Sequence, residues 1–573
     1  MRLQSPPKKP GIYLLDDDFE QTLSNSHPML KEDYVVLEEG ALVPGGAISL
    51  VSKDALAIFA QYFAIGIVYA AIPGVSYPLV KNYFDAQGYQ SKTYSTLVNI
   101  AWSFKIFMGG LSDLVPIMGL RRKPWMMIGW LVCIASLVVL SSLSPGPPAQ
   151  PLHKKTKDDP TFPFYNSPLP TYTLLSMLAT FGYVTSDCAS DALVVQYAMR
   201  EPLATRGRIQ TAIYTVRAMG QILSNLFVGI CLNSHDFGGK FNFSISINVF
   251  YIILLIPCLV AMTATTTMLM EHKTEMVPFR KWIHQFWQLT QKQAMWQILA
   301  FRFINNVFQN YESTAPSPLG QYWAGVQPFM EGITKAIGYV IYTAILATVG
   351  RYGLNWNWRW TIAITSIALV VIDGTVYFLT IWDVIRNPWF YTGVTLTDQI
   401  PGGVRFIVSA FVATELADLG NEGAVYGLVT TVSNLTTPVS AVIYKLIDSY
   451  FSLTNDNFVK EANHTLSDEA FRSWMRWNVT SSFLVAYGMK LFALVWLFLL
   501  PPQKAHVQRL KRYGRVSPFA GGLSMFFFFF FLAFSLFFNL TSMFPHTAWW
   551  RIAGGSGQRP TTAAPKPTTT LKL

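Results

Sequence analysis

Runs of about 20 mostly apolar residues recur along the chain, separated by short clusters of charged residues. A helix of this length crosses a hydrocarbon core about 30 Å thick. Membrane-spanning β-strands are shorter and alternate apolar with polar residues, so they do not fit the pattern. The chain is therefore predicted to be an all-α polytopic membrane protein. The twelve predicted core spans are 55–80, 93–113, 124–142, 171–198, 209–232, 246–269, 294–315, 328–349, 359–382, 403–418, 423–448 and 479–500.

The spans fall into two sets of six with a longer basic stretch between them. This layout is typical of carriers built from two similar halves. The predicted units are a cytosolic disordered tail at 1–54, an N-terminal six-helix bundle at 55–269, a cytosolic connector at 270–293, a C-terminal six-helix bundle at 294–500 and a basic tail at 501–573. The tail contains a phenylalanine-rich apolar run. We expect an extra, thirteenth helix there, over 524–540, and the alternative is an error in the gene model.

The charge is sparse and unevenly placed. Only 13% of residues are charged, against 51% hydrophobic, although the net charge is +11. A soluble chain would carry about twice that share of charged residues. The basic residues lie in short loops beside apolar runs, where they orient a membrane protein, so nucleic acid is not an expected partner. The excess of Lys and Arg in alternate loops, which is clearest in the Arg121–Lys123 cluster, predicts that the N-terminus and residues 501–515 face the cytosol. The bilayer is the expected surrounding, and we expect a monomer in the plasma membrane.

Three motifs occur in a fixed order. The stretch from Gly109 to Pro124 combines glycines, Asp113, Arg121 and Arg122 in a cytosolic turn. The fourth span contains Ser186-Asp-Cys-Ala-Ser-Asp-Ala-Leu-Val-Val-Gln196, and the eleventh begins with the segment from Asn421 and Glu422 to Asn434. Together they resemble the folate–biopterin transporter family, a branch of the major facilitator superfamily, over residues 55–500.

The resemblance implies twelve helices in two bundles, alternating access, and proton-coupled uptake of a folate, biopterin or related pterin. The implied partners are this small-molecule substrate and protons. Residues in the turn and the eleventh span are then expected to act in gating or conformational change: Asp113, Arg121, Arg122, Glu422 and Asn434.

Ionisable residues inside a span are costly and usually face a cavity or a partner. Asp187 and Asp191 are four residues apart, which places both on one helix face. Lys105 and Arg217 lie at a similar distance from the cytosolic ends of their own spans. We therefore predict a charge cluster that acts in substrate binding or proton coupling. Asp191 is expected to pair with a base and Asp187 to carry the proton, whereas the bases hold either the aspartates or the substrate.

The second half also contains polar residues at membrane depth. Arg302 is a candidate cation for an anionic substrate, with helix packing as the alternative. Glu312 is expected to be wet, and Lys335 and Lys445 are expected to reach water with their long side chains. Asp373 lies deep in the ninth span, and no partner for it is predicted.

Phosphate-binding loops, metal-ligand clusters and nucleophile motifs are not found in the sequence, so an enzyme, a cofactor or a bound metal is not expected. Two alternatives remain beside a pterin or folate carrier. One is a facilitator for another small organic solute. The other is a non-transporting receptor or scaffold with the same fold. The charged residues inside the spans argue against it, because a scaffold would gain little from the cost of placing them in the membrane.

Overall fold

The computed structural model describes residues 45–148, 168–201, 208–271, 273, 278–352, 356–393, 396, 399–416, 422–464, 467–544 and 546–558. Within these ranges the chain is helical and forms only isolated β-bridges. Most of the predicted tail at 1–54 lies outside the described residues. The phenylalanine-rich stretch lies inside them and is helical.

The first half consists of helices that cover the first six predicted spans. They are α3 (Lys53–Gly74) with the π-helical η2 (Ser76–Tyr83), α4 (Gly88–Asn99), the 3-10 segment η3 (Ile100–Phe104), α5 (Lys105–Leu114), α6 (Lys123–Ser142), α7 (Leu169–Met199), α8 (Arg208–Cys231) and α9 (Ile247–Met268). The second span, predicted as one helix, is thus broken. The Asn99 side chain donates to the Ser95 carbonyl at 2.8 Å, which competes with regular α-helical bonding where the 3-10 segment begins.

The second half covers the other six predicted spans. Its helices are α11 (Gln293–Gln309), α13 (Pro328–Tyr352), α14 (Trp358–Ile381), α17 (Gln399–Leu416), α18 (Glu422–Asp448) and α20 (Glu469–Phe492) continued by η8 (Ala493–Leu499). The seventh span ends at Gln309 rather than 315, and the short α12 (Pro316–Pro318) begins at Pro316. The twelfth starts earlier than 479, because the Asp468 side chain caps it by accepting from the Phe471 N–H at 2.7 Å.

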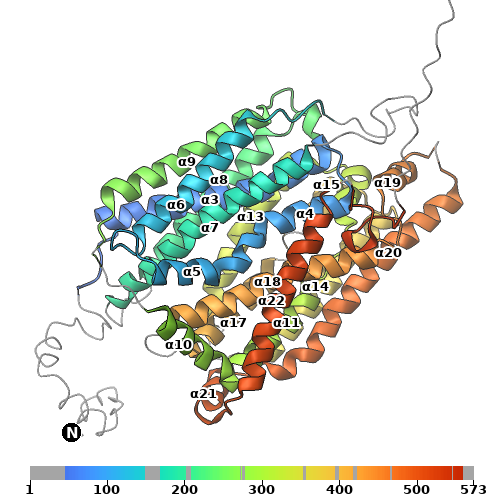
Figure 1. Ribbon diagram of the computed structural model, residues 1–573. Helices are drawn as coiled ribbons and strands as arrows, with labels where there is room; N and C mark the ends of the chain where they lie inside the picture. The colour runs from blue at the N-terminus through green and yellow to red at the C-terminus, as the bar shows by residue number, and fades with distance from the viewer. Residues whose placement is uncertain are drawn as a thin grey trace, which may run out of the picture.

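The helices form two groups, with α3 to α9 beside the helices of the second half in Figure 1. The halves meet where α8 packs on α13 and where α18 packs on α4, η3 and α5. Six of the described helical segments are long and apolar enough to cross a membrane. They are Lys53–Tyr83, Lys123–Ser142, Ile247–Met268, Trp358–Ile381, Glu469–Leu499 and Pro518–Thr541.

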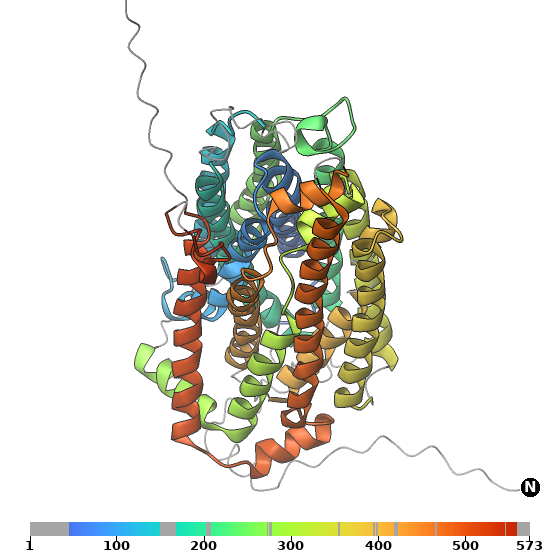
Figure 2. The ribbon, with the colours of Figure 1, turned by 90° about the vertical axis from the view of Figure 1, so that its right-hand side faces the viewer.

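The last of these segments is α22 (Pro518–Thr541), in the predicted tail. It is longer than the predicted 524–540 because the Ser517 side chain caps its N-terminus and Pro518 fits the first turn. It runs along one edge of the bundle in Figure 2. Phe528 and Leu532 belong to the apolar core of the second half, whereas Leu536 and Leu540 pack on that of the first. The helix therefore contacts both halves.

The connector and the tail each contain a further helix outside the twelve spans. These are α10 (Phe279–Gln291) and α21 (Lys504–Tyr513). The two segments are joined by backbone hydrogen bonds, from the Gln293 N–H to the Arg515 carbonyl and from the Ser517 N–H to the Gln291 carbonyl. The connector and the basic tail thus lie together at one end of the bundle.

Candidate functional site

Four charged side chains lie together inside the first half. Their similar distances from the cytosolic ends of their spans predicted this cluster. The Lys105 Nζ donates to Asp187 Oδ2 at 3.0 Å and to Asp191 Oδ2 at 2.5 Å. Arg217 Nη1 lies 3.3 Å from Asp187 Oδ1. Two cations therefore face two carboxylates, and the cluster as a whole is neutral.

The two carboxylates differ in their surroundings. The Asp187 side chain is fully buried and contacts both cations, whereas that of Asp191 is 23% exposed. Asp191 pairs with Lys105, as expected, and also accepts a hydrogen bond from the Tyr62 hydroxyl. The contacts of Asp187 with Lys105 and Arg217 agree with the alternative that the bases hold the aspartates, whereas proton transfer at Asp187 stays a prediction. Asp187 has two bases because α5 and α8 both approach this face of α7.

Helix geometry explains how the cluster forms. Asp187 and Asp191 are one turn apart on α7, so a single lysine reaches both. That lysine, Lys105, is the first residue of α5, directly after the 3-10 break. Arg217 is brought close by Gly66 on α3, where an added Cβ would lie only 2.2 Å from the Arg217 carbonyl oxygen. The crossing of α3 and α8 therefore requires glycine at this position.

Aromatic rings complete the cluster. The Arg217 guanidinium lies 5.1 Å from the Tyr69 ring centre and 5.2 Å from that of Trp102, and the Lys105 Nζ is also 5.2 Å from Trp102. Such contacts favour a cation away from water. Sequence reasoning missed Tyr62, Tyr69 and Trp102. The spacing of seven residues between Tyr62 and Tyr69, which places both on one face of α3, is the signal that could have found the two tyrosines.

A cavity of about 340 Å³ lies beside the cluster and between the two halves. Arg217, Tyr69 and Trp102 line it from the first half, and Asn434 and Thr437 from α18. The Asn434 side chain also donates to the Trp102 carbonyl at 3.2 Å, which joins the halves at the cavity wall. Arg217 is thus in contact with Asp187 and with the cavity.

Arg302 is not part of this cluster. It lies on α11 in the second half and donates to the Ser433 hydroxyl of α18 at 3.3 Å. The contact joins two helices of the same half. It agrees with the packing alternative that the sequence left open for Arg302.

The predicted gating turn packs on the end of α9. Glu271 accepts hydrogen bonds from the backbone N–H groups of Arg121, Arg122 and Lys123, each at 2.8 Å. The Arg122 guanidinium donates to the Ser112 hydroxyl at 2.6 Å. Glu271 thereby satisfies donors at the start of α6, a role that its distance in sequence concealed. Asp113 and Glu422 lie in α5 and α18, but their side chains lie outside the described residues, as does Asn421.

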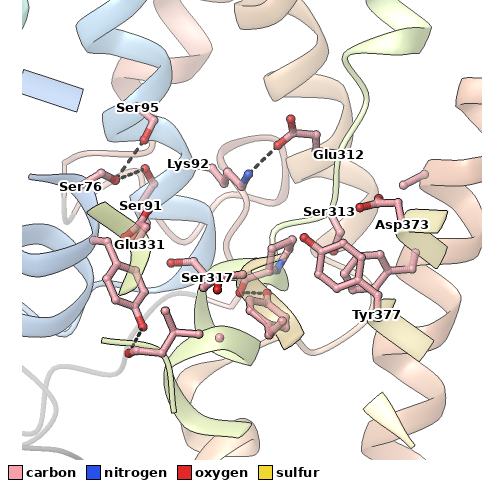
Figure 3. A pocket seen from close by; sticks show the side chains of 18 of the residues that line it. Ser76, Ser91, Lys92, Ser95, Glu312, Ser313, Ser317, Glu331, Asp373 and Tyr377 are labelled. Atoms are coloured by element: carbon pink, nitrogen blue, oxygen red, sulfur yellow. Dashed lines mark hydrogen bonds and ion pairs between the residues drawn. The ribbon is translucent and has the colours of Figure 1, made fainter. Parts of the chain in front are cut away.

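A second polar cavity lies between the halves, and Figure 3 shows it with Lys92 paired to Glu312 at 2.5 Å. Lys335 and Asp373 also line this cavity. Lys335 pairs with Glu331 at 2.7 Å, and Asp373 accepts from the Tyr487 hydroxyl at 3.0 Å, a partner that the sequence did not reveal. Among the described residues, no group of His, Cys, Asp and Glu could hold a metal ion.

The expectation that Lys445 reaches water was wrong. Its side chain is fully buried, and its Nζ donates to the side-chain oxygens of Thr93, Asn539 and Ser542 at 2.9, 2.9 and 2.8 Å. The cause is α22, whose end covers this part of α18.

Solved structures of membrane transporters share this fold at low sequence identity. A D-xylose–proton symporter is 12% identical, with a TM-score of 0.53 over 80% of this chain and 99% of that chain. A bacterial homologue of the human lysosomal transporter Spinster is 13% identical, with a TM-score of 0.51 over 81% and 98%. The likeness to these structures shows the fold: helices in two halves, with a cavity between the halves beside buried charges.

The family follows from the sequence comparison. The model of the BT1 family matches residues 69–150 and 161–466, and the chain therefore belongs to this family. A relative from Synechocystis sp., named folate-biopterin transporter, is 22% identical over 418 residues, which cover 71% of this chain and 77% of the relative. The resemblance inferred from the three motifs is confirmed.

Proposed function

We propose that this transporter takes up a pterin or folate by alternating access and that proton transfer at Asp187 and Asp191 drives the uptake. The observation that carries the proposal is the position of Arg217, which contacts Asp187 on one side and the cavity on the other. Support for the substrate class comes from the family and from the relative named folate-biopterin transporter.

The geometry suggests how proton and substrate would be coupled. A proton on Asp187 removes the charge that Arg217 faces, so the guanidinium becomes available to an anionic group in the cavity. Binding of that anion in turn favours the protonated form of Asp187, because linkage between two sites is reciprocal. Asp191 is the more exposed carboxylate and shares Lys105 with Asp187, so it is the proposed point of proton entry. Asp191 also accepts a hydrogen bond from the Tyr62 hydroxyl.

Uptake assays test the proposal. Labelled folate and biopterin are supplied to cells that lack their own carriers, with and without a proton ionophore. We expect accumulation that the ionophore abolishes. If neither solute enters, the pterin and folate assignment is wrong, although the transporter class remains.

A variant tests the coupling step. Asp187→Asn cannot release a proton, and Arg217 no longer faces a charge there. We therefore expect accumulation to be lost while exchange of substrate across the membrane, measured per amount of folded protein, persists. The matched control is Asp236→Asn, the same change at an exposed acid. Normal pH-dependent accumulation by Asp187→Asn would contradict the assignment.

A further inference from the structure

The second cavity has a volume of about 380 Å³, within the range of small-molecule sites. Ser76, Ser91 and Lys92 line it from the first half. The opposite wall comes from α14 and α20, which belong to the second half. Pro73 of this cavity and Tyr69 of the first cavity lie four residues apart on α3, so the two cavities are one helical turn apart.

One side of the second cavity is aromatic and contains a carboxylate. The rings of Tyr377 and Phe483 lie 4.4 Å apart, and Phe483 is 6.1 Å from Tyr487. Asp373, one turn before Tyr377 on α14, is mostly buried and accepts from the Tyr487 hydroxyl. Figure 3 shows Asp373 and Tyr377 on the same side of the cavity. A planar ring can stack on such a wall, and a carboxylate there can accept from N–H groups on the ring edge.

Besides Asp373, the charged residues that line the cavity are two lysine–glutamate pairs and Lys490, whose Nζ donates to the Gln309 carbonyl at 3.2 Å. Lys92 joins Glu312 across the two halves, and Lys335 joins Glu331 along α13. The lysine side chains are 25% and 35% exposed. Partly exposed pairs of this kind are weak, so an anionic group of a ligand could replace the glutamate at little cost.

We propose that this cavity is a second recognition site for the substrate, and that it selects amphoteric heteroaromatic solutes. Asp373 accepts from adjacent N–H donors of an aminopyrimidinone edge, the ring stacks on Tyr377 and Phe483, and Lys335 binds an anionic substituent. The proposal rests on the proposed function and extends it. Because the cavities lie one helical turn apart along α3, a substrate passing through the carrier meets both in succession.

Binding assays on the purified full-length protein test this site. The probes are biopterin, which has a neutral side chain, and pterin-6-carboxylate, which has an anionic one. Both are followed by their own fluorescence. We expect Asp373→Asn and Tyr377→Leu to weaken binding of both probes by about tenfold or more, since each removes a contact to the shared ring. Lys335→Gln should weaken only pterin-6-carboxylate.

The controls are Asp236→Asn and Lys240→Gln, two exposed residues outside both cavities. Lys335→Gln changes a partly exposed side chain and keeps the test valid if Asp373→Asn fails to fold. If the wild-type protein binds both pterins and the three cavity variants bind them equally well, the second site is refuted while the proposed function stands. If the wild-type protein binds neither pterin, the proposed substrate class fails together with this site.

Discussion

At the scale of single residues, the cluster at Asp187 is a problem of charge balance. Two cations and two carboxylates are mutually compensated, and at least Asp187 is shielded from solvent. Removing one charge from such a group leaves another without compensation in surroundings of low dielectric constant. The largest loss in the free energy of unfolding is therefore expected for a variant at the most buried position with the most ion pairs.

We expect Asp187→Asn to lower the free energy of unfolding by about 3–5 kcal/mol, the usual cost of breaking a buried pair. Asp191→Asn should cost less, because its side chain is partly exposed. Adding Arg217→Gln to Asp187→Asn restores neutrality, so we expect a coupling of about 0.5–3 kcal/mol in a double-mutant cycle. Thermal unfolding of purified protein measures these effects, with Asp236→Asn as control. Additive losses would show that the two side chains do not interact.

At the scale of helices, α22 is the feature that departs most from a plain two-bundle carrier. Asn539 in its last turn and Ser542 directly after it supply two of the three side-chain oxygens around the buried Lys445. Asn539 also donates to the Pro438 carbonyl at 3.0 Å. An ammonium group placed among neutral oxygens, and away from water, depends on each of these partners.

We predict that Asn539→Leu lowers the free energy of unfolding by about 1–3 kcal/mol. The reason is that Lys445 loses a hydrogen-bond partner and faces an apolar side chain instead. Adding Lys445→Met should recover part of this loss, since the pair then becomes apolar. Phe537→Leu, on an exposed part of the same helix, is the control and should have little effect. Equal stability of Asn539→Leu and the wild-type protein would mean that α22 does not hold Lys445 in place.

The sequence predicted the positions of the helices, but only some of the contacts between them. Apolar runs determine where helices form. The similar distances of Lys105, Arg217 and the two aspartates from the cytosolic ends of their spans were enough to predict that these side chains form one cluster. The Glu271 cap and the burial of Lys445 depend on how separate helices pack, which local spacing does not encode. The 3-10 break before Lys105 was missed for a different reason, since it lies within an otherwise continuous apolar pattern.

At the scale of the whole molecule, the halves are joined by many bonds at the end where η2 lies. The Lys81 Nζ donates to Asn455 Oδ1 at 2.6 Å, and the Tyr77 hydroxyl donates to the Val326 carbonyl at 2.7 Å. Nearby, an added Cβ on Gly332 would lie 2.6 Å from the Asn225 carbonyl oxygen, so α8 and α13 are in close contact. The alternating access that we propose requires the halves to separate at this end in the opposite state.

Cross-linking tests this requirement at the Lys92–Glu312 pair, which spans the halves and is partly exposed. Cysteines at both positions, Lys92→Cys and Glu312→Cys, can be joined by a short bifunctional thiol reagent that is cleaved by reductant. We expect the cross-link to abolish uptake, because the halves can no longer part here, and reductant to restore it. Each single-cysteine variant treated in the same way is the control, since it removes the ion pair without joining the halves. Full uptake by the cross-linked protein would show that this end stays closed throughout the transport cycle.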